Sequence, residues 1–135
     1  MTVLAVIFVI IICFLSTIII FSYNKKNDVI LLKYTMLDKG KMNINVVNAS
    51  TVGAIRSYSE KNDGQDKYIT FYTTFPLLSR YGKNEFEIEI DEECKNIYFN
   101  RGNINLGNIT KKYKGELYGL VLRKNDTLNS WEIVK

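Results

Sequence analysis

Residues 86–90, with the sequence FEIEI, decide the fold class of this chain. Phe86, Ile88 and Ile90 alternate there with Glu87 and Glu89. Successive side chains of a β-strand point to opposite faces, so this order predicts a strand with one face in an apolar core and the other in water. The clearest pattern in the chain therefore indicates a β-domain.

Similar runs lie on both sides of this stretch, separated by turn residues. DKGK (38–41) predicts a turn, and NDG (62–64) predicts a tight hairpin because Asp and Gly tolerate positive φ. Pro76, the only proline, ends or bends the run before it. We expect further strands over 28–35, 42–48, 54–60, 67–75, 96–100, 116–124 and 130–135. About seven or eight strands at this spacing predict an all-β antiparallel sandwich or barrel, and no segment after residue 22 has convincing helical periodicity.

The N-terminal segment has a different character. Residues 3–21 are uncharged and apolar apart from Ser16 and Thr17. As a helix this run spans about 28 Å, close to the thickness of a bilayer core. Its length, its start without basic residues and the large neighbours of Ser22 favour an uncleaved signal anchor over a cleaved signal peptide. We therefore expect a transmembrane anchor at 1–22, a juxtamembrane linker at 23–27 and a β-sandwich domain at 28–135.

The orientation of this anchor is open at the level of the sequence. Lys25 and Lys26 follow the apolar run and nothing basic precedes it. The positive-inside rule then favours a cytoplasmic domain. This stands against the periplasmic location that a family resemblance implies below.

The residue types present exclude several kinds of chemistry. The 135-residue chain has no histidine and two cysteines, so Ser-His-Asp and Cys-His catalysis and histidine metal sites are absent. Cys13 lies inside the apolar run, which makes an intrachain disulfide with Cys94 implausible. Cys94 has no histidine to activate it, so we interpret it as structural. The net charge of +4 comes without a dense basic run, which argues against nucleic acid. We expect a protein that is not an enzyme and has no catalytic residues, cofactor or metal.

An acidic strip is the first candidate for binding. Glu85, Glu87, Glu89 and Asp91 would line one face of the strand that contains FEIEI. Such a strip can meet a basic partner or hold a hard cation such as calcium. It can equally be a solvated face that discourages edge-to-edge pairing.

Two tyrosines are the second candidate. Tyr68 and Tyr72 share a strand face with Thr70 and Thr74, and this face is the less apolar of the two. Exposed tyrosines are good anchors at protein interfaces, but the same residues also serve in cores. Trp131, by contrast, is expected in the core.

Four stretches together resemble a known family. They are DKGKMNINVVN (38–48), DKYITFYTTFPLLSRYGKNEF (66–86), EIDEECKNIYF (89–99) and KKYKGELYGLVLRKN (111–125). This combination is similar to small envelope proteins described as periplasmic immunity proteins of type VI secretion. The resemblance implies a membrane-held, immunoglobulin-like β-domain that neutralises a toxin by binding it, in the inner membrane with the domain in the periplasm.

The chain departs from that family in two ways. Members are commonly lipoproteins, but isoleucines precede Cys13 here in place of the small residues of a lipoprotein signal. Members often carry a cysteine where this chain has Asn43, so a family disulfide to Cys94 cannot form. Two other functions stay open: a bitopic structural or adaptor subunit of a bacterial envelope complex, and an enzyme that uses carboxylates or a metal.

Overall fold

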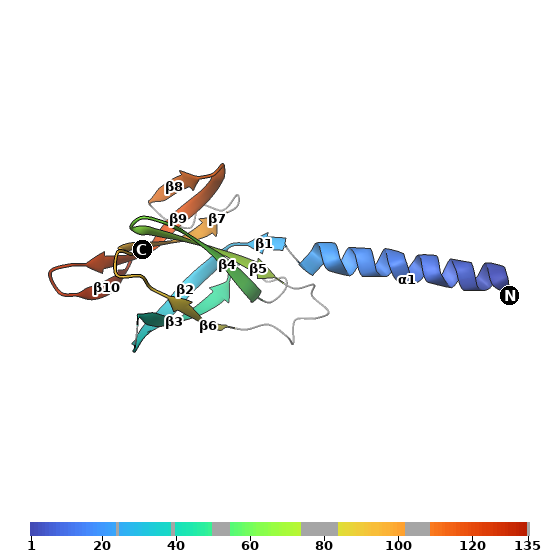
Figure 1. The fold of residues 1–135 in the computed structure, drawn as a ribbon, viewed down its shortest axis with the longest axis horizontal. Helices are drawn as coiled ribbons and strands as arrows, with labels where there is room; N and C mark the ends of the chain where they lie inside the picture. The colour runs from blue at the N-terminus through green and yellow to red at the C-terminus, as the bar shows by residue number, and fades with distance from the viewer. Residues whose placement is uncertain (24, 39, 50–54, 74–83, 102–108, 135) are drawn as a thin grey trace.

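The computed structural model describes residues 1–23, 25–38, 40–49, 55–73, 84–101 and 109–134, and the side chains of all of these except 19–23, 25 and 27. A long helix, α1 (Thr2–Tyr23), precedes a β-domain (Figure 1). The described strands, in chain order, are β1 (Lys25–Asn27), β2 (Val29–Leu37), β3 (Lys41–Asn48), β4 (Ile55–Asp63), β5 (Asp66–Thr73), β6 (Glu85–Glu89), β7 (Asn96–Arg101), β8 (Thr110–Tyr113), β9 (Glu116–Asn125) and β10 (Ser130–Ile133).

The strands form two sheets. The smaller sheet has three strands in the order β2-β3-β6. The larger has seven: β4 pairs with one edge of β5, while β1 and β7 share its other edge. β9 follows β7, and β8 and β10 share the far edge of β9.

The main core lies between the two sheets. Phe86 and Ile88 of β6 are buried, while Glu85, Glu87 and Glu89 are exposed, as the FEIEI pattern predicts. Strand β3 alternates in the same way. From the larger sheet, residues such as Ile69, Phe71 and Phe99 pack against these side chains. The expectation of an all-β, two-layered domain is confirmed.

The expectation that all strands are antiparallel is wrong at one place. Residues Asp66–Ile69 of β5 pair in parallel with Asn96–Phe99 of β7. Between these two strands the chain passes through β6 in the other sheet. Parallel neighbours need a crossover connection, and the excursion through the second sheet provides it.

Local turn chemistry is as predicted. The NDG stretch joins β4 to β5, with Gly64 at a φ of +60°, and Gly40 of DKGK has a φ of +69° between β2 and β3. Positive φ suits glycine because it lacks a Cβ. Residues 74–75 of the expected 67–75 strand and Pro76 lie outside the described residues.

Two short strands were not expected. Residues 25–27, which we expected to be part of a linker, form β1 and pair with Phe71–Thr73 of β5. Residues 110–113 form β8 and pair with the first part of β9. The chain directly after α1 is therefore part of the larger sheet.

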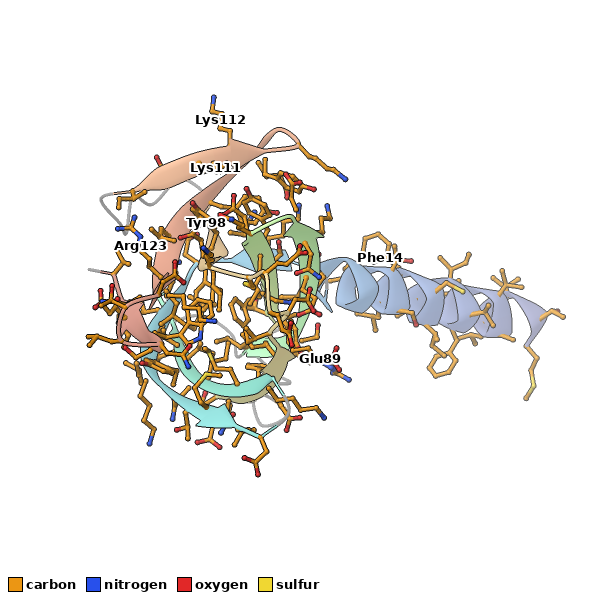
Figure 2. All side chains as sticks on the ribbon, turned by 60° about the vertical axis from the view of Figure 1, so that its left-hand side comes forward. Phe14, Glu89, Tyr98, Lys111, Lys112 and Arg123 are labelled. Carbon is orange, nitrogen blue, oxygen red and sulfur yellow. The ribbon has the colours of Figure 1, made fainter. Side chains whose placement is uncertain are left out.

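The helix α1 carries exposed apolar side chains along its described length. Val3, Leu4 and Phe14 have exposed fractions of 71%, 74% and 68%, and Phe14 projects away from the helix in Figure 2. Within the part of the chain that the structure describes, no helix has both the length and the hydropathy of a membrane span.

Two tyrosine hydroxyls join the sheets at opposite edges of the sandwich. Tyr58 of β4 donates a hydrogen bond to the backbone carbonyl of Glu87 in β6, at 2.7 Å. Tyr34 of β2 donates to the backbone carbonyl of Trp131 in β10. Each bond links an outer strand of one sheet to an outer strand of the other, and Trp131 itself is buried, as predicted.

Candidate binding surfaces

An acidic edge runs along β6 and the residues that follow it. Glu85, Glu87, Glu89 and Asp91 are all exposed, and Glu60 of β4 is exposed as well. We call these five residues the acidic edge. β6 has β3 as its only paired neighbour among the described strands, so its other side is an outer edge of the sandwich.

Two lysines form ion pairs with this edge in the described structure: the buried Lys67 with Glu60, at 3.1 Å, and Lys41 with Glu87. Lys41 Nζ lies 3.2 Å from Glu87 Oε1, and both side chains are about half exposed, at 45% and 52%. The Asn45 amide lies 3.5 Å from Glu85 Oε1, which is at the limit of a hydrogen bond. The contacts of Lys41 and Asn45 are exposed and therefore weak in water, so the carboxylates of β6 keep most of their capacity to bind a partner.

The negative charge of this edge affects the pKa of Tyr58. Burial raises the pKa of its hydroxyl above the usual value, and the charges of Glu60, Glu89 and Glu87 raise it further. Glu60 of β4 and Glu87 and Glu89 of β6 therefore act together on one phenol. Within the described ranges, no three acidic or cysteine side chains gather closely enough to hold a metal ion.

Tyr68 lies in a different environment from the one an interface anchor needs. Its exposed fraction is 1%, and its ring stacks on Tyr113 at a centroid distance of 4.1 Å and on Tyr98 at 5.2 Å. Tyr118 meets it edge-on at 4.9 Å. These four residues, which we call the tyrosine cluster, cover the face of the larger sheet that points away from the main core. A partner cannot touch Tyr68 while the cluster is closed.

A polar network fastens β8 over the tyrosine cluster. Lys111 Nζ of β8 lies 2.6 Å from Asp66 Oδ2 of β5, and Asn96 of β7 donates to Asp66 Oδ1 at 2.9 Å. The Lys111 ammonium also lies 5.9 Å from the ring centroids of Tyr68 and Tyr98. Burial alone would raise the pKa of Asp66, but hydrogen bonds from Lys111, Asn96 and Tyr68 and the Lys111 charge outweigh it, so the pKa is lowered.

Tyr72 is more accessible than Tyr68. It is half-buried on the same face of β5, and its hydroxyl lies 3.3 Å from Ser59 Oγ of β4. The two tyrosines of the prediction therefore differ: Tyr72 is partly available to a partner, and Tyr68 packs inside the tyrosine cluster. Neither lies on β6, so the structure does not join them to the acidic edge in one continuous strand.

Glu89 of the acidic edge and the exposed lysines of β8, Lys111 and Lys112, lie at opposite ends of the β-domain (Figure 2). Figure 2 shows Glu89 at the lower right of the domain and Lys111 and Lys112 at its upper end. Figure 1 separates β6 and β8 in the same way. A basic partner would therefore be drawn to the β6 side.

Cys94 is buried beside the main core. Its exposed fraction is 3%, and burial raises the pKa of its thiol from 9.0 to about 11. The neighbouring charge of Lys67 lowers this pKa, but by less than burial raises it. A thiol that stays protonated at neutral pH is a poor nucleophile, which agrees with a structural role.

Sequence reasoning missed one feature, a pocket at the other side of the sandwich. It has a volume of about 330 Å³, lies between β2 and the β9–β10 pair, and has Arg101 as its one charged lining residue. The sequence contains a weak signal for it: Arg101 directly follows the expected strand NIYFN (96–100), and Gly119 interrupts the apolar run LYGLVL.

Gly119 of β9 pairs with Phe99 of β7 and lies diagonally across from Arg101, whose own partner is Leu117. A Cβ at Gly119 would lie 3.0 Å from Arg101 Nε and 3.2 Å from Arg101 Cγ. The glycine therefore makes room for the aliphatic part of the Arg101 side chain.

Compared with known proteins, the chain matches no family model, no curated protein and no solved structure.

Proposed function

We propose that this protein is a membrane-anchored, non-catalytic binding protein that neutralises a secreted toxin by direct contact. In this proposal residues 3–21 hold the protein in the inner membrane, and the β-domain lies in the periplasm. The immunoglobulin-like character of the domain belongs to the same proposal, because it follows from the resemblance of 38–125 to immunity proteins of type VI secretion.

The observation that carries the proposal is the acidic edge. Carboxylates from β4, β6 and the residues after β6 are exposed on one side of the domain. Among the described residues, Lys67 pairs with Glu60 and Lys41 with Glu87, and the carboxylates of Glu85, Glu89 and Asp91 have no ion pair with a described cation. An accumulation of one sign of charge attracts a partner of the opposite sign and speeds its association. A toxin with a basic surface is the partner that this chemistry fits.

The edge is also held rigidly, which binding by occlusion needs. The hydrogen bond from Tyr58 to the Glu87 carbonyl ties β6 to β4, and β3 pairs with β6 along Glu85–Glu89. A preorganised surface loses little conformational entropy when it binds. The β-domain would block the toxin by covering its active surface, without any chemical step.

The first experiment tests protection in cells. The toxin encoded next to this gene is expressed in a strain that lacks the gene, together with either the wild-type protein or a variant with Glu85→Gln, Glu87→Gln and Glu89→Gln. We expect the wild type to restore survival and the variant to lose most of this protection, because the steering charges are gone. Survival without any copy of the gene would overturn the proposal.

A matched control separates local charge from total charge. The variant with Asp63→Asn, Asp126→Asn and Glu132→Gln removes exposed carboxylates from other places. We expect this control to protect as well as the wild type. Equal loss in both variants would show that the acidic edge has no special role.

The location of the domain is tested by fusions at Lys135. Alkaline phosphatase activity without fluorescence of a fused fluorescent protein is expected for a periplasmic domain. The opposite result would follow the hint from Lys25 and Lys26, and would leave protection against a toxin that acts in the cytoplasm as the alternative.

A second function is favoured by α1. Apart from Thr2, Ser16 and Thr17, its described side chains are apolar, and they are exposed on all sides. Such a helix needs lipid or other helices around it. A bitopic adaptor of an envelope complex would use α1 to pack on other spans. Replacement of residues 1–22 by an unrelated anchor would abolish the activity of an adaptor and leave that of an immunity protein intact.

A further inference from the structure

The pocket at the β2 side of the sandwich has the composition of a ligand site. Seven of its lining residues are apolar and Arg101 is the one that is charged: the apolar ones are Ile30, Leu31, Leu32, Leu120, Val121, Ile133 and Val134. Ligand sites are mostly apolar with a few polar groups that fix orientation, and about 330 Å³ lies at the small end of their range.

Arg101 is buried but incompletely bonded. Its exposed fraction is 7%, and its Nη1 donates to the backbone carbonyl of Val29 at 2.6 Å. Its Nε is buried and has no hydrogen-bond acceptor in the described structure. Buried donors in proteins are nearly always satisfied, so this unpaired N–H calls for an acceptor.

The buried Asp28 acts on the charge of Arg101. Burial lowers the pKa of its guanidinium, and the charge of the buried Asp28 opposes this shift. With Nη1 already bonded to Val29, the edge formed by Nε and Nη2 is the one suited to a carboxylate, which can accept two parallel hydrogen bonds from it. An anionic group on a ligand would satisfy the donor that the protein leaves open.

Two β-bulges place their extra residues in this pocket. On β2, Leu31 pairs with Val46 and Lys33 with Asn45, so Leu32 is the extra residue. Bulges bend a strand and redirect a side chain, and they are frequent next to functional sites.

The second bulge is on β9. There Ile97 of β7 pairs with Leu122 and Tyr98 pairs with Leu120, so Val121 is the extra residue. Its carbonyl accepts a hydrogen bond from the Val134 amide at 2.8 Å. Leu32 and Val121 both line the pocket, so irregularities of two separate strands meet at the same place.

The mouth of the pocket is apolar. Ile30, Leu32 and Ile133 line it and have exposed fractions of 41%, 58% and 39%. Other outer strands of the domain carry charge instead, such as the glutamates of β6. An apolar chain entering here would cover side chains that now face water.

We propose that this pocket binds a small amphiphilic carboxylate, a short fatty acid whose chain lies against β2 and β10 and whose carboxylate pairs with Arg101. The site is separate from the acidic edge and does not depend on the toxin-binding proposal. It belongs to the opposite side of the sandwich, next to the hydrogen bond between Tyr34 and Trp131.

The experiment uses the full chain in lipid nanodiscs, labelled with ¹⁵N. Sodium hexanoate is added and the amide shifts of Leu32, Val121 and Val134 are followed. Hexan-1-ol at the same free concentration is the neutral probe of equal chain length. We expect shifts at these three amides that saturate with hexanoate and an affinity about tenfold lower for the alcohol, because the charge-assisted bonds to Arg101 are missing.

Variants locate the site. Arg101→Gln should reduce hexanoate affinity about tenfold and bring it to the level of the alcohol. Leu32→Trp places a bulky ring at the exposed mouth and should abolish binding of both probes without affecting the fold. Arg123→Gln, at an exposed position of β9, the strand that pairs with β7, is the matched control and should bind as the wild type does.

Each outcome decides the proposal. Equal affinity for acid and alcohol, or full binding in Leu32→Trp, overturns it. Should Arg101→Gln fail to fold, the ratio of acid to alcohol in the wild type and the Leu32→Trp result still decide, because neither requires that variant.

Discussion

At the scale of single residues, position in the fold changes what a side chain can do. Tyr68 and Tyr72 look equivalent in the sequence, since both lie on the less apolar face of one strand. Tyr68 is buried because Tyr113 of β8 stacks on it, and β8 joins the sheet through β9. No property of residues 67–75 reveals a cover that arrives from a distant segment. The alternation of 85–91, by contrast, is a local property, and the structure agrees with it.

Gly119 gives the sharpest prediction at this scale. Gly119→Ala should lower the free energy of unfolding by about 1–3 kcal/mol, because the new methyl group meets the buried middle of the Arg101 side chain. Chemical denaturation followed by the fluorescence of Trp131, the only tryptophan, measures the change. Ser57→Ala on the exposed face of β4 is the control, and an equal, small effect of both substitutions would contradict the proposed contact.

At the scale of elements, the strands with alternating or β-branched sequences were predictable and the short polar ones were not. β8 has the sequence TKKY, without an apolar alternation, and it exists because β9 offers an unpaired edge and Asp66 binds Lys111. The parallel pairing of β5 with β7 depends on the route of the chain through the other sheet. Such relations are set by packing at long range, which a pattern within one segment does not contain.

The attachment of β8 should depend on pH. The pKa of Asp66 is lowered in the folded protein, so the stability it contributes is present above the ordinary value of 3.8 and is lost as the pH falls through the lower folded value. We expect Asp66→Asn to cost about 1 kcal/mol at pH 7, since Lys111 is partly exposed. This difference from the wild type should vanish below the folded pKa of Asp66.

Denaturation of both proteins at pH 7, 5, 4 and 3 measures this dependence. Asp126→Asn is the control, because Asp126 pairs at 3.1 Å with Lys95 on a well-exposed surface. A difference between Asp66→Asn and the wild type that stays constant over the whole pH range would contradict the role of the Asp66 charge.

At the scale of the whole molecule, the sandwich is closed by hydrogen bonds at both of its sides. Tyr58 joins β4 to β6, and Tyr34 joins β2 to β10. The acidic edge lies beside the first bond and the pocket beside the second. The two proposed sites are therefore stabilised by separate contacts.

The two bonds should act independently. Tyr58→Phe and Tyr34→Phe each remove one hydroxyl, and each should cost about 1 kcal/mol of unfolding free energy. The double variant should lose the sum to within about 0.5 kcal/mol, because the sites share no partner. Tyr72→Phe, which removes a hydroxyl near Ser59 on an exposed surface, is the control. A double variant that departs from the sum by more than about 1 kcal/mol would show that the two sides are coupled.

The short strand β1 limits how far the β-domain can move away from α1. One residue separates the end of α1 at Tyr23 from β1 at Lys25, and β1 is paired with β5 while Lys26 forms an ion pair with Glu116 of β9. A link of this length extends only a few ångströms. Under the proposal that α1 lies in a bilayer, the domain would move little relative to its anchor, in contrast to a lipoprotein on a long flexible tether. Under the proposed function, a toxin would be bound only where it comes to the membrane surface, and Gly-Ser repeats inserted after Tyr23 would increase the distance from the anchor at which the domain can bind it.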